Sequence, residues 1–162
     1  MQPVTQSYLE EPSSCFRKPT VKPYNKDSVM DILMNKSPLM AYFAQLAGLD
    51  EMLDNPERQI TCFAPCKEYC ELYWNLFQGN TDHLRARNLV LSCVLKASLT
   101  ETQLTQLDIV PTMNRYSSID IRYIPEKGSI LLNQNVYIVQ SNLFGINGTV
   151  HITNGLIEPT EF

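Results

Sequence analysis

The sequence lacks long hydrophobic runs: no apolar stretch approaches the roughly 18–20 residues that a membrane-spanning helix needs. Its first residues, MQPVTQSYLEEPSS, lack the basic start and the apolar centre of a secretory signal, and only three residues follow Pro159. We therefore expect no membrane insertion, and a protein that stays on the side of the membrane where it is made.

Catalytic signatures are also missing. The chain has two histidines, His83 and His151, and no glycine-rich phosphate loop, G-x-S-x-G or H-E-x-x-H pattern. Its net charge of −4 argues against a nucleic-acid surface as the main partner. The sequence therefore predicts a protein that is not an enzyme, binds no cofactor and does not bind nucleic acid.

The five cysteines do not form a disulfide framework. Their number is odd and three of them are clustered, which favours reduced and mostly buried thiols. The spacing of residues 62, 66 and 70 would stack three thiols along one helix if all were helical, but a metal site would need a fourth ligand. Because cysteine is often buried, we expect core thiols and no metal at Cys15, Cys62, Cys66, Cys70 and Cys93.

Residues 1–26 are predicted to form an extended arm without a core, because four of the ten prolines fall there and each disfavours regular structure. The arm carries four basic and two acidic side chains, whereas residues 27–162, predicted to be a single domain, carry nine basic and fifteen acidic ones. Its apolar content suggests docking on grooves of other protein subunits; the alternative is that it wraps its own domain. The candidate docking residues are Tyr8, Leu9, Phe16, Arg17, Lys18, Lys22 and Tyr24.

Helical signals dominate the first half of the domain. Asp27 or Ser28 is a candidate N-cap, and a second helix begins at Ser37-Pro38 and ends at Gly48. After a short strand over 59–63, periodic apolar residues predict a helix that buries Tyr73, Leu76 and Phe77, among others. A further helix is expected over about 82–96 with Leu84 facing inward, followed by a capping box at Thr100 and Gln103.

From Val110 onward the pattern changes to alternating apolar and polar residues. A hairpin turn is expected at 126–129, and strands at 130–132, 136–139 and 150–152. Helices followed by strands, without alternation between them, predict an α+β fold.

Two segments carry a resemblance to a known family. Residues 61–65, TCFAP, match the pattern T-x-F-A-P, and residues 147–159 are similar to N-G-x-x-H-x-I-D-x-x-L-x-P. In this order and at this separation they resemble the fasciclin (FAS1) domain over about residues 27–160. The resemblance implies a fasciclin-like fold, with helices mainly from the first half packed on a β-sandwich or wedge formed mainly by the second half. The matching motif residues are Thr61, Phe63, Ala64, Pro65, Asn147, Gly148, His151 and Pro159.

These motif residues have physical roles in a fold. We expect Phe63 to be a buried anchor, Pro65 to start a helix, and Asn147-Gly148 to form a turn with positive φ. His151 alternates with its apolar neighbours, and the resemblance implies a structural hydrogen bond for it, not a catalytic role.

The sequence departs from adhesive members of the family at two places. A Tyr-His pair of those members matches Ser92-Cys93 here, and an aspartate before the closing Asn-Gly matches Asn142. An uncharged amide cannot complete a metal-ion site as a carboxylate can. The resulting hypothesis is an intracellular or virion-associated linking protein that binds other subunits of an assembly, such as a minor capsid protein of a large virus. The alternative is a secreted or surface cell-adhesion domain.

Overall fold

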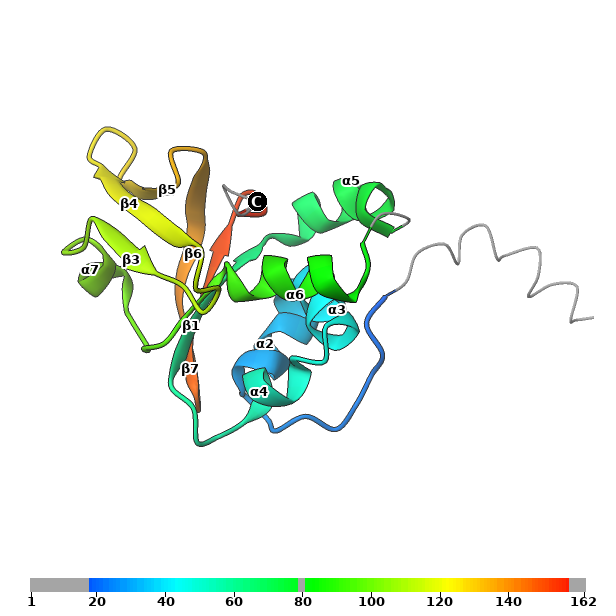
Figure 1. The fold of residues 1–162 in the computed structure, drawn as a ribbon. Helices are drawn as coiled ribbons and strands as arrows, with labels where there is room; N and C mark the ends of the chain where they lie inside the picture. The colour runs from blue at the N-terminus through cyan, green and yellow to red at the C-terminus, as the bar shows by residue number, and fades with distance from the viewer. Residues whose placement is uncertain (1–17, 79–80, 158–162) are drawn as a thin grey trace, which may run out of the picture.

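The structure is a computed structural model that describes residues 18–78 and 81–157. Most helices lie on one side of the molecule and most strands on the other (Figure 1). The helices are α2 (Val29–Lys36), α3 (Pro38–Leu46), α4 (Asp50–Asp54), α5 (Lys67–Gln78), α6 (His83–Leu91) and α7 (Glu101–Leu104). The strands are β1 (Ile60–Pro65), β2 (Val94–Leu95), β3 (Ile109–Pro111), β4 (Ser118–Ile124), β5 (Ser129–Leu132), β6 (Val136–Gly145) and β7 (Gly148–Thr153).

The seven strands form one mixed sheet in the order β2-β1-β7-β6-β5-β4-β3, which bends into a nearly closed wedge. Strands β1 and β7 pair in parallel, with Phe63 opposite His151, and the other neighbouring strands are antiparallel. The parallel pair joins two segments far apart in the sequence, so it fastens the helical half of the chain to the β half. The predicted α+β fold, with helices first and a β wedge after them, is confirmed.

Local capping chemistry starts the helices where the sequence indicated. Ser28 Oγ accepts a hydrogen bond from the backbone N of Asp31 at 3.1 Å, and Pro38 occupies the first turn of α3. Thr100 and Gln103 form the complete predicted capping box at the start of α7.

Several features of the helices differ from the prediction. Pro65, expected to start a helix, is the last residue of β1, and α5 begins at Lys67; the short helix α4 was not predicted. The helix expected over 82–96 ends at Leu91, because Val94 and Leu95 pair with β1 as β2; Leu84 is exposed. In α5, Trp74 is buried together with Phe77, whereas Tyr73 and Leu76 face solvent. Apolar residues surround most of α5, so periodicity alone could not identify which side meets the core.

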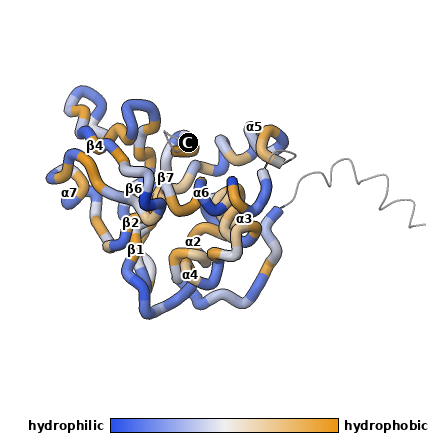
Figure 2. The backbone as a smooth tube through the Cα atoms, in the orientation of Figure 1, coloured by the Kyte–Doolittle hydropathy of each residue, from blue (hydrophilic) through white to orange (hydrophobic). Residues whose placement is uncertain are grey.

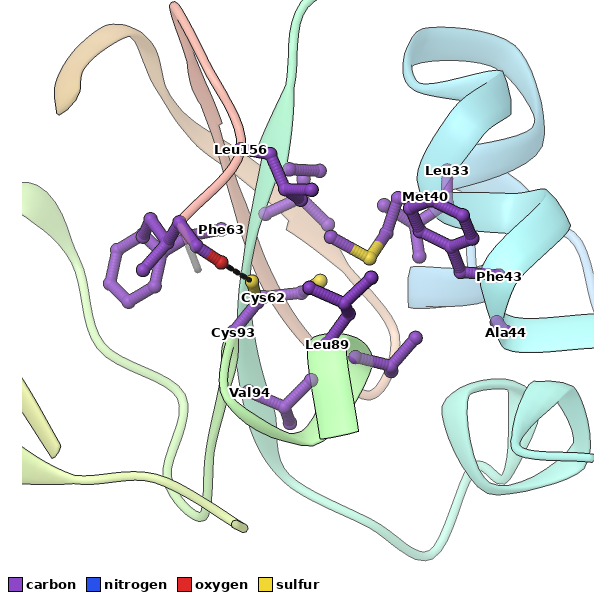
Figure 3. Close-up of a cluster of buried hydrophobic side chains, with 14 of the residues drawn as sticks. Leu33, Met40, Phe43, Ala44, Cys62, Phe63, Leu89, Cys93, Val94 and Leu156 are labelled. Atoms are coloured by element: carbon purple, nitrogen blue, oxygen red, sulfur yellow. Dashed lines mark hydrogen bonds between the residues drawn. The ribbon is translucent and has the colours of Figure 1, made fainter. Parts of the chain in front are cut away.

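The core continues across the sheet. Every residue of β1 and β7 is buried, so both faces of this strand pair are covered. Figure 3 shows Cys62 pointing from β1 toward Met40 and Phe43 of the helical layer, with Phe63 on the other side of the strand. Figure 2 shows hydrophobic segments where α2, α3 and α4 pack together and hydrophilic loops at the far ends of the β wedge.

Candidate functional site

Asn147 holds the β6–β7 hairpin against the helical layer. Its buried side-chain Oδ1 accepts a hydrogen bond from the backbone N of Val29 at 2.8 Å. Its Nδ2 donates to the carbonyl oxygens of Leu53 at 2.9 Å and Asn55 at 3.0 Å. The amide thus pairs with an otherwise unsatisfied donor at the start of α2 and two acceptors at the end of α4. Both donor hydrogens are used inside the fold, so the side chain acts as an internal fastener.

Of the pair Asn147-Gly148, which was expected to form a turn with positive φ, Gly148 has a positive φ of 156° and Asn147 does not. The two loop residues of the hairpin are Ile146 and Asn147, between the paired residues Gly145 and Gly148. The glycine at 148 is required by a close approach: a Cβ there would lie 2.0 Å from the carbonyl oxygen of Ile60. The motif glycine therefore permits β7 to pair with the start of β1.

His151 is buried and uses both ring nitrogens. Nδ1 accepts a hydrogen bond from the backbone N of Asn142 at 3.1 Å, and Nε2 lies 2.8 Å from the carbonyl oxygen of Leu99. These partners require the tautomer with hydrogen on Nε2. Burial lowers the pKa of His151 below its ordinary value, so the neutral ring is favoured. The ring stacks on Phe63 with centroids 5.7 Å apart, and neither nitrogen is left for proton transfer.

Asn142 occupies a left-handed backbone position, with φ of 61°, where the register between β6 and β7 shifts. Asparagine adopts this conformation more readily than most residues. Its Oδ1 accepts a hydrogen bond from the backbone N of Glu101 at 2.9 Å, so it holds the first turn of α7 against the sheet. The residue that matches the family's adhesive aspartate thus has a structural contact in this chain.

At the other place where the sequence departs from adhesive members, Ser92 and Cys93 are both buried. Ser92 Oγ accepts a hydrogen bond from Asn114 Nδ2 at 2.9 Å, and Cys93 Sγ lies 3.4 Å from the carbonyl oxygen of Ile157 (Figure 3). Both side chains are covered by the fold. They present no surface to a partner.

The remaining motif residues are also structural contacts. Thr61 Oγ1 donates to the carbonyl oxygen of Ala97 and accepts from the backbone N of Leu99 at 2.8 Å. The carbonyl oxygen of Pro65 accepts a hydrogen bond from Ser37 Oγ at 2.6 Å. Ala64 is fully buried in β1, and Pro159 lies outside the described residues.

The described thiols do not gather into a site. Cys62 lies in β1 and Cys70 in α5, so the spacing of residues 62, 66 and 70 does not produce a row on one helix. Burial raises the pKa of Cys62 and of Cys70, which keeps both thiols protonated. Within residues 18–78 and 81–157 no group of histidine, cysteine and acidic side chains is placed to hold a metal ion; Cys15 lies outside them.

Residues 18–25, called the strap below, run along the helical layer. The backbone N and O of Thr20 each bond the side-chain amide of Gln45 at 2.7 Å. The hydroxyl of Tyr24 donates to Asp50 Oδ2 at 2.7 Å, and Lys22 Nζ lies 3.4 Å from the same carboxylate oxygen. Burial and the hydrogen bond to Asp50 raise the pKa of Tyr24 to about 12.

These contacts correct part of the arm hypothesis. Lys22 and Tyr24 bind their own domain, because the carboxylate that they share lies in α4 of the same chain. In the structure this part of the arm therefore wraps its own domain, which was the alternative hypothesis. Lys18 is exposed and lines the cavity described below. The candidates Tyr8, Leu9, Phe16 and Arg17 lie outside the described residues.

A cavity of about 380 Å³, called the strap groove below, lies between the strap and helices α2, α3 and α5. Its walls are largely apolar, and Lys67 and Glu71 contribute charge. Its lining consists of Lys18, Pro19, Val21, Met34, Pro38, Lys67, Cys70, Glu71 and Trp74.

Next to this groove, α5 carries an apolar ridge that faces solvent. Leu72 is 76% exposed, Leu76 is 59% exposed and Tyr73 is 40% exposed; these three residues are called the α5 ridge below. Leu72 and Leu76 are four residues apart and therefore neighbours on one side of the helix. Sequence reasoning placed Tyr73 and Leu76 in the core. The signal available against that assignment was Glu68, which precedes Leu72 by one helical turn and marks the same side as exposed.

Comparison with known proteins agrees with this architecture. Residues 37–159 match the model of the Fasciclin domain. No curated protein matches the sequence. Among solved structures, a FAS1 domain pair from the insect cell adhesion molecule fasciclin I aligns with a TM-score of 0.62 and 18% identity. The alignment covers 85% of this chain and 51% of that one, so this chain spans about half the length of its match.

Helices in residues 18–78 and 81–157 are all too short or too polar to cross a bilayer. The family model covers most of the chain, and the fold agrees with it independently. This protein belongs to the fasciclin domain family.

Proposed function

We propose that this chain is a non-enzymatic interaction module that links protein subunits of a larger assembly, and that the α5 ridge is its main contact surface. Fasciclin domains are generally protein-interaction or adhesion modules and are typically non-catalytic. Beyond this general property of the family, we propose the contact surface, the kind of partner and the linking role.

The observation that carries the proposal is the exposure of two leucines on one side of α5. Leu72 and Leu76 leave most of their side-chain surface in water, and burying a leucine stabilises a complex by roughly 1.5–3 kcal/mol. The opposite side of the same helix is already buried through Trp74 and Phe77. The ridge is therefore not needed for the domain's own core, and a partner that covers it gains apolar burial.

The charges around the ridge indicate the chemistry of the partner. Glu68 lies one turn before Leu72 on the same side of α5, and Glu71 is adjacent to Leu72 in sequence; both are exposed. An apolar groove with a basic rim on another subunit would complement this pattern, because opposite charges at the rim favour the correct encounter.

The internal use of the polar motif residues supports a role without catalysis. The polar side-chain atoms of His151 and Asn147 form hydrogen bonds with backbone groups inside the domain. Two hydrophobic leucines on a rigid helix suit recognition, whereas acid–base chemistry needs an accessible titratable group.

The arm adds a second proposed contact. Tyr8, Leu9 and Arg17 remain candidates for docking on a neighbouring subunit, because Lys22 and Tyr24 are engaged with Asp50. A small rigid domain with an arm is the form of a minor structural protein, and the narrower hypothesis of a viral capsid component rests on that form alone.

Co-purification from the native source tests the linking role. We expect the tagged chain to be recovered in fixed stoichiometry with other subunits, and the variant Leu72→Glu/Leu76→Glu to lose them. Val139→Glu is the matched control, because Val139 is a 57% exposed apolar residue on strand β6 and not on α5. Equal melting temperatures of the variants would show that the fold is intact.

Retention of the subunits by the double leucine variant would refute the ridge as the contact. A purified chain that binds no other subunit but attaches cells when it is immobilised would instead support the adhesion alternative. Deletion of residues 1–17, which leaves the strap in place, measures the contribution of the arm separately.

A further inference from the structure

The strap groove lies where the described chain begins. Lys18, Pro19 and Val21 line it from one side, and Trp74 lines it from α5. Val21 is 87% exposed although it borders an apolar cavity. The groove is thus an apolar surface that the described residues leave open, and the residues immediately before Lys18 in the sequence start at its edge.

The strap cannot shift easily away from this position. Gln45 holds Thr20 through two backbone hydrogen bonds of 2.7 Å each. Further along, Asn25 is held at Asp54 by its backbone N at 2.8 Å and by its side-chain amide. These anchors fix the position of residues 20–25 along the helical layer.

Residues 16 and 17, an aromatic and a basic residue, complement the apolar walls and the acidic rim of the groove. Phe16 precedes Lys18 by two residues, and two extended residues span at most about 7 Å, so its ring is within reach of the cavity. An aromatic ring brings a large apolar surface and prefers tilted or edge contacts with other rings, such as that of Trp74. Next to it, Arg17 would lie near the rim, where Glu71 is the acidic group.

We propose that Phe16 of the same chain occupies the strap groove and packs against Met34, Pro38 and Trp74. Occupancy within one chain is favoured over exchange with a second copy because a short tether raises the effective concentration of Phe16 to about millimolar or more. The alternatives, a second copy or another protein, must supply an equivalent ring without this advantage.

This arrangement extends the surface proposed above. Glu71, on the groove rim, is adjacent in sequence to Leu72 of the α5 ridge. An arm seated at Phe16 therefore begins beside the ridge, and its earlier residues Tyr8 and Leu9 lie within reach of the same partner. This extension rests on the proposed function, whereas the occupancy of the groove by Phe16 does not.

The single tryptophan of the chain makes the inference testable, because Trp74 lines the groove. In the full chain without a partner, we expect Phe16→Ala to shift the emission of Trp74 to the red and to increase its quenching by acrylamide. Phe16→Leu should restore most of the wild-type signal, and Tyr8→Ala is the matched control that should leave it unchanged.

Methyl NMR of the six methionines provides a second readout. Phe16→Leu removes an aromatic ring while keeping apolar bulk, so we expect the signal of Met34 to move and that of Met30, in the core of the same helix, to stay. Unchanged Trp74 emission together with an unchanged Met34 signal would overturn the proposal. A wild-type signal that is lost on dilution would also overturn it, because it would assign the groove to a second copy. Failure of the subunit-capture experiment would leave these spectroscopic results unaffected.

Discussion

Replacing Asn147 should destabilise the fold far more than its loop position suggests. Asn147→Ala removes one acceptor and two donors, which leaves the buried backbone N of Val29 and the carbonyl oxygen of Leu53 without their partner. An unsatisfied buried polar group costs about 1–3 kcal/mol, so we expect a loss of about 3–5 kcal/mol in the free energy of unfolding. Typical domains have only about 5–15 kcal/mol in total.

A second substitution at the same position separates the roles of the two ends of the amide. Asn147→Asp keeps an acceptor for Val29 but places a carboxylate oxygen against the carbonyl oxygens of Leu53 and Asn55. At neutral pH it should be at least as destabilising as alanine, because the buried charge replaces both donors. If Asn147 served only as an N-terminal helix cap, the stability of Asn147→Asp would instead be close to that of wild type, because aspartate is an equally good cap.

Urea unfolding followed by circular dichroism measures these effects, with the slope of the transition used to check that unfolding remains two-state. Asn135→Ala is the control, because Asn135 is an exposed asparagine in the β5–β6 turn and should change stability by no more than about 0.5 kcal/mol. The reasoning is refuted if Asn147→Ala unfolds within about 1 kcal/mol of wild type, or if aspartate is tolerated.

Three further predictions follow from the core and its titratable groups. Phe63→Ala should cost about 3–5 kcal/mol because the buried ring stacks on His151, whereas Phe144→Ala, at an exposed ring, should cost little; thermal melts of both variants give the comparison. The lowered pKa of His151 means that the unfolded chain binds a proton more readily than the folded one, so its contribution to stability is full above pH 6.5 and lost as the pH falls below it. His151→Gln should therefore show a smaller loss of stability between pH 8 and pH 5 than wild type, and an equal loss would contradict this assignment. Thiol titration of the denatured, unreduced protein should count all five cysteines; a count of three or one would indicate disulfides.

Local chemistry explains what the sequence could predict. The Ser28 cap and the Thr100–Gln103 capping box depend on residues within one helical turn of each other, so the pattern contains the whole interaction. The change in hydrophobic period near Val110 likewise indicated the β half, because strands with one polar side alternate by themselves.

The features that the sequence could not predict depend on interactions between residues far apart in the chain. Tyr24 and Asp50 are 26 positions apart, and nothing in either segment identifies the other as its partner. The apolar pair Val94 and Leu95 is compatible with either a helix or a strand, and it forms a strand because it pairs with β1. On α5 the choice between Trp74 and Leu76 for the core was settled by the rings of Tyr42 and Phe43, which Trp74 and Phe77 meet across the helix interface.

The motif residues identify the family because they build its fold, and for the same reason they say little about the partner. His151, Asn147 and Gly148 are buried between β1, β7 and the helices, where substitution disturbs packing whatever the domain binds. The proposed contact surface, the α5 ridge, and the neighbouring strap groove contain no motif residue. A fasciclin fold can therefore keep its closing motif while Leu72 faces solvent, and we expect the binding specificity of this chain to reside in α5 and in the arm.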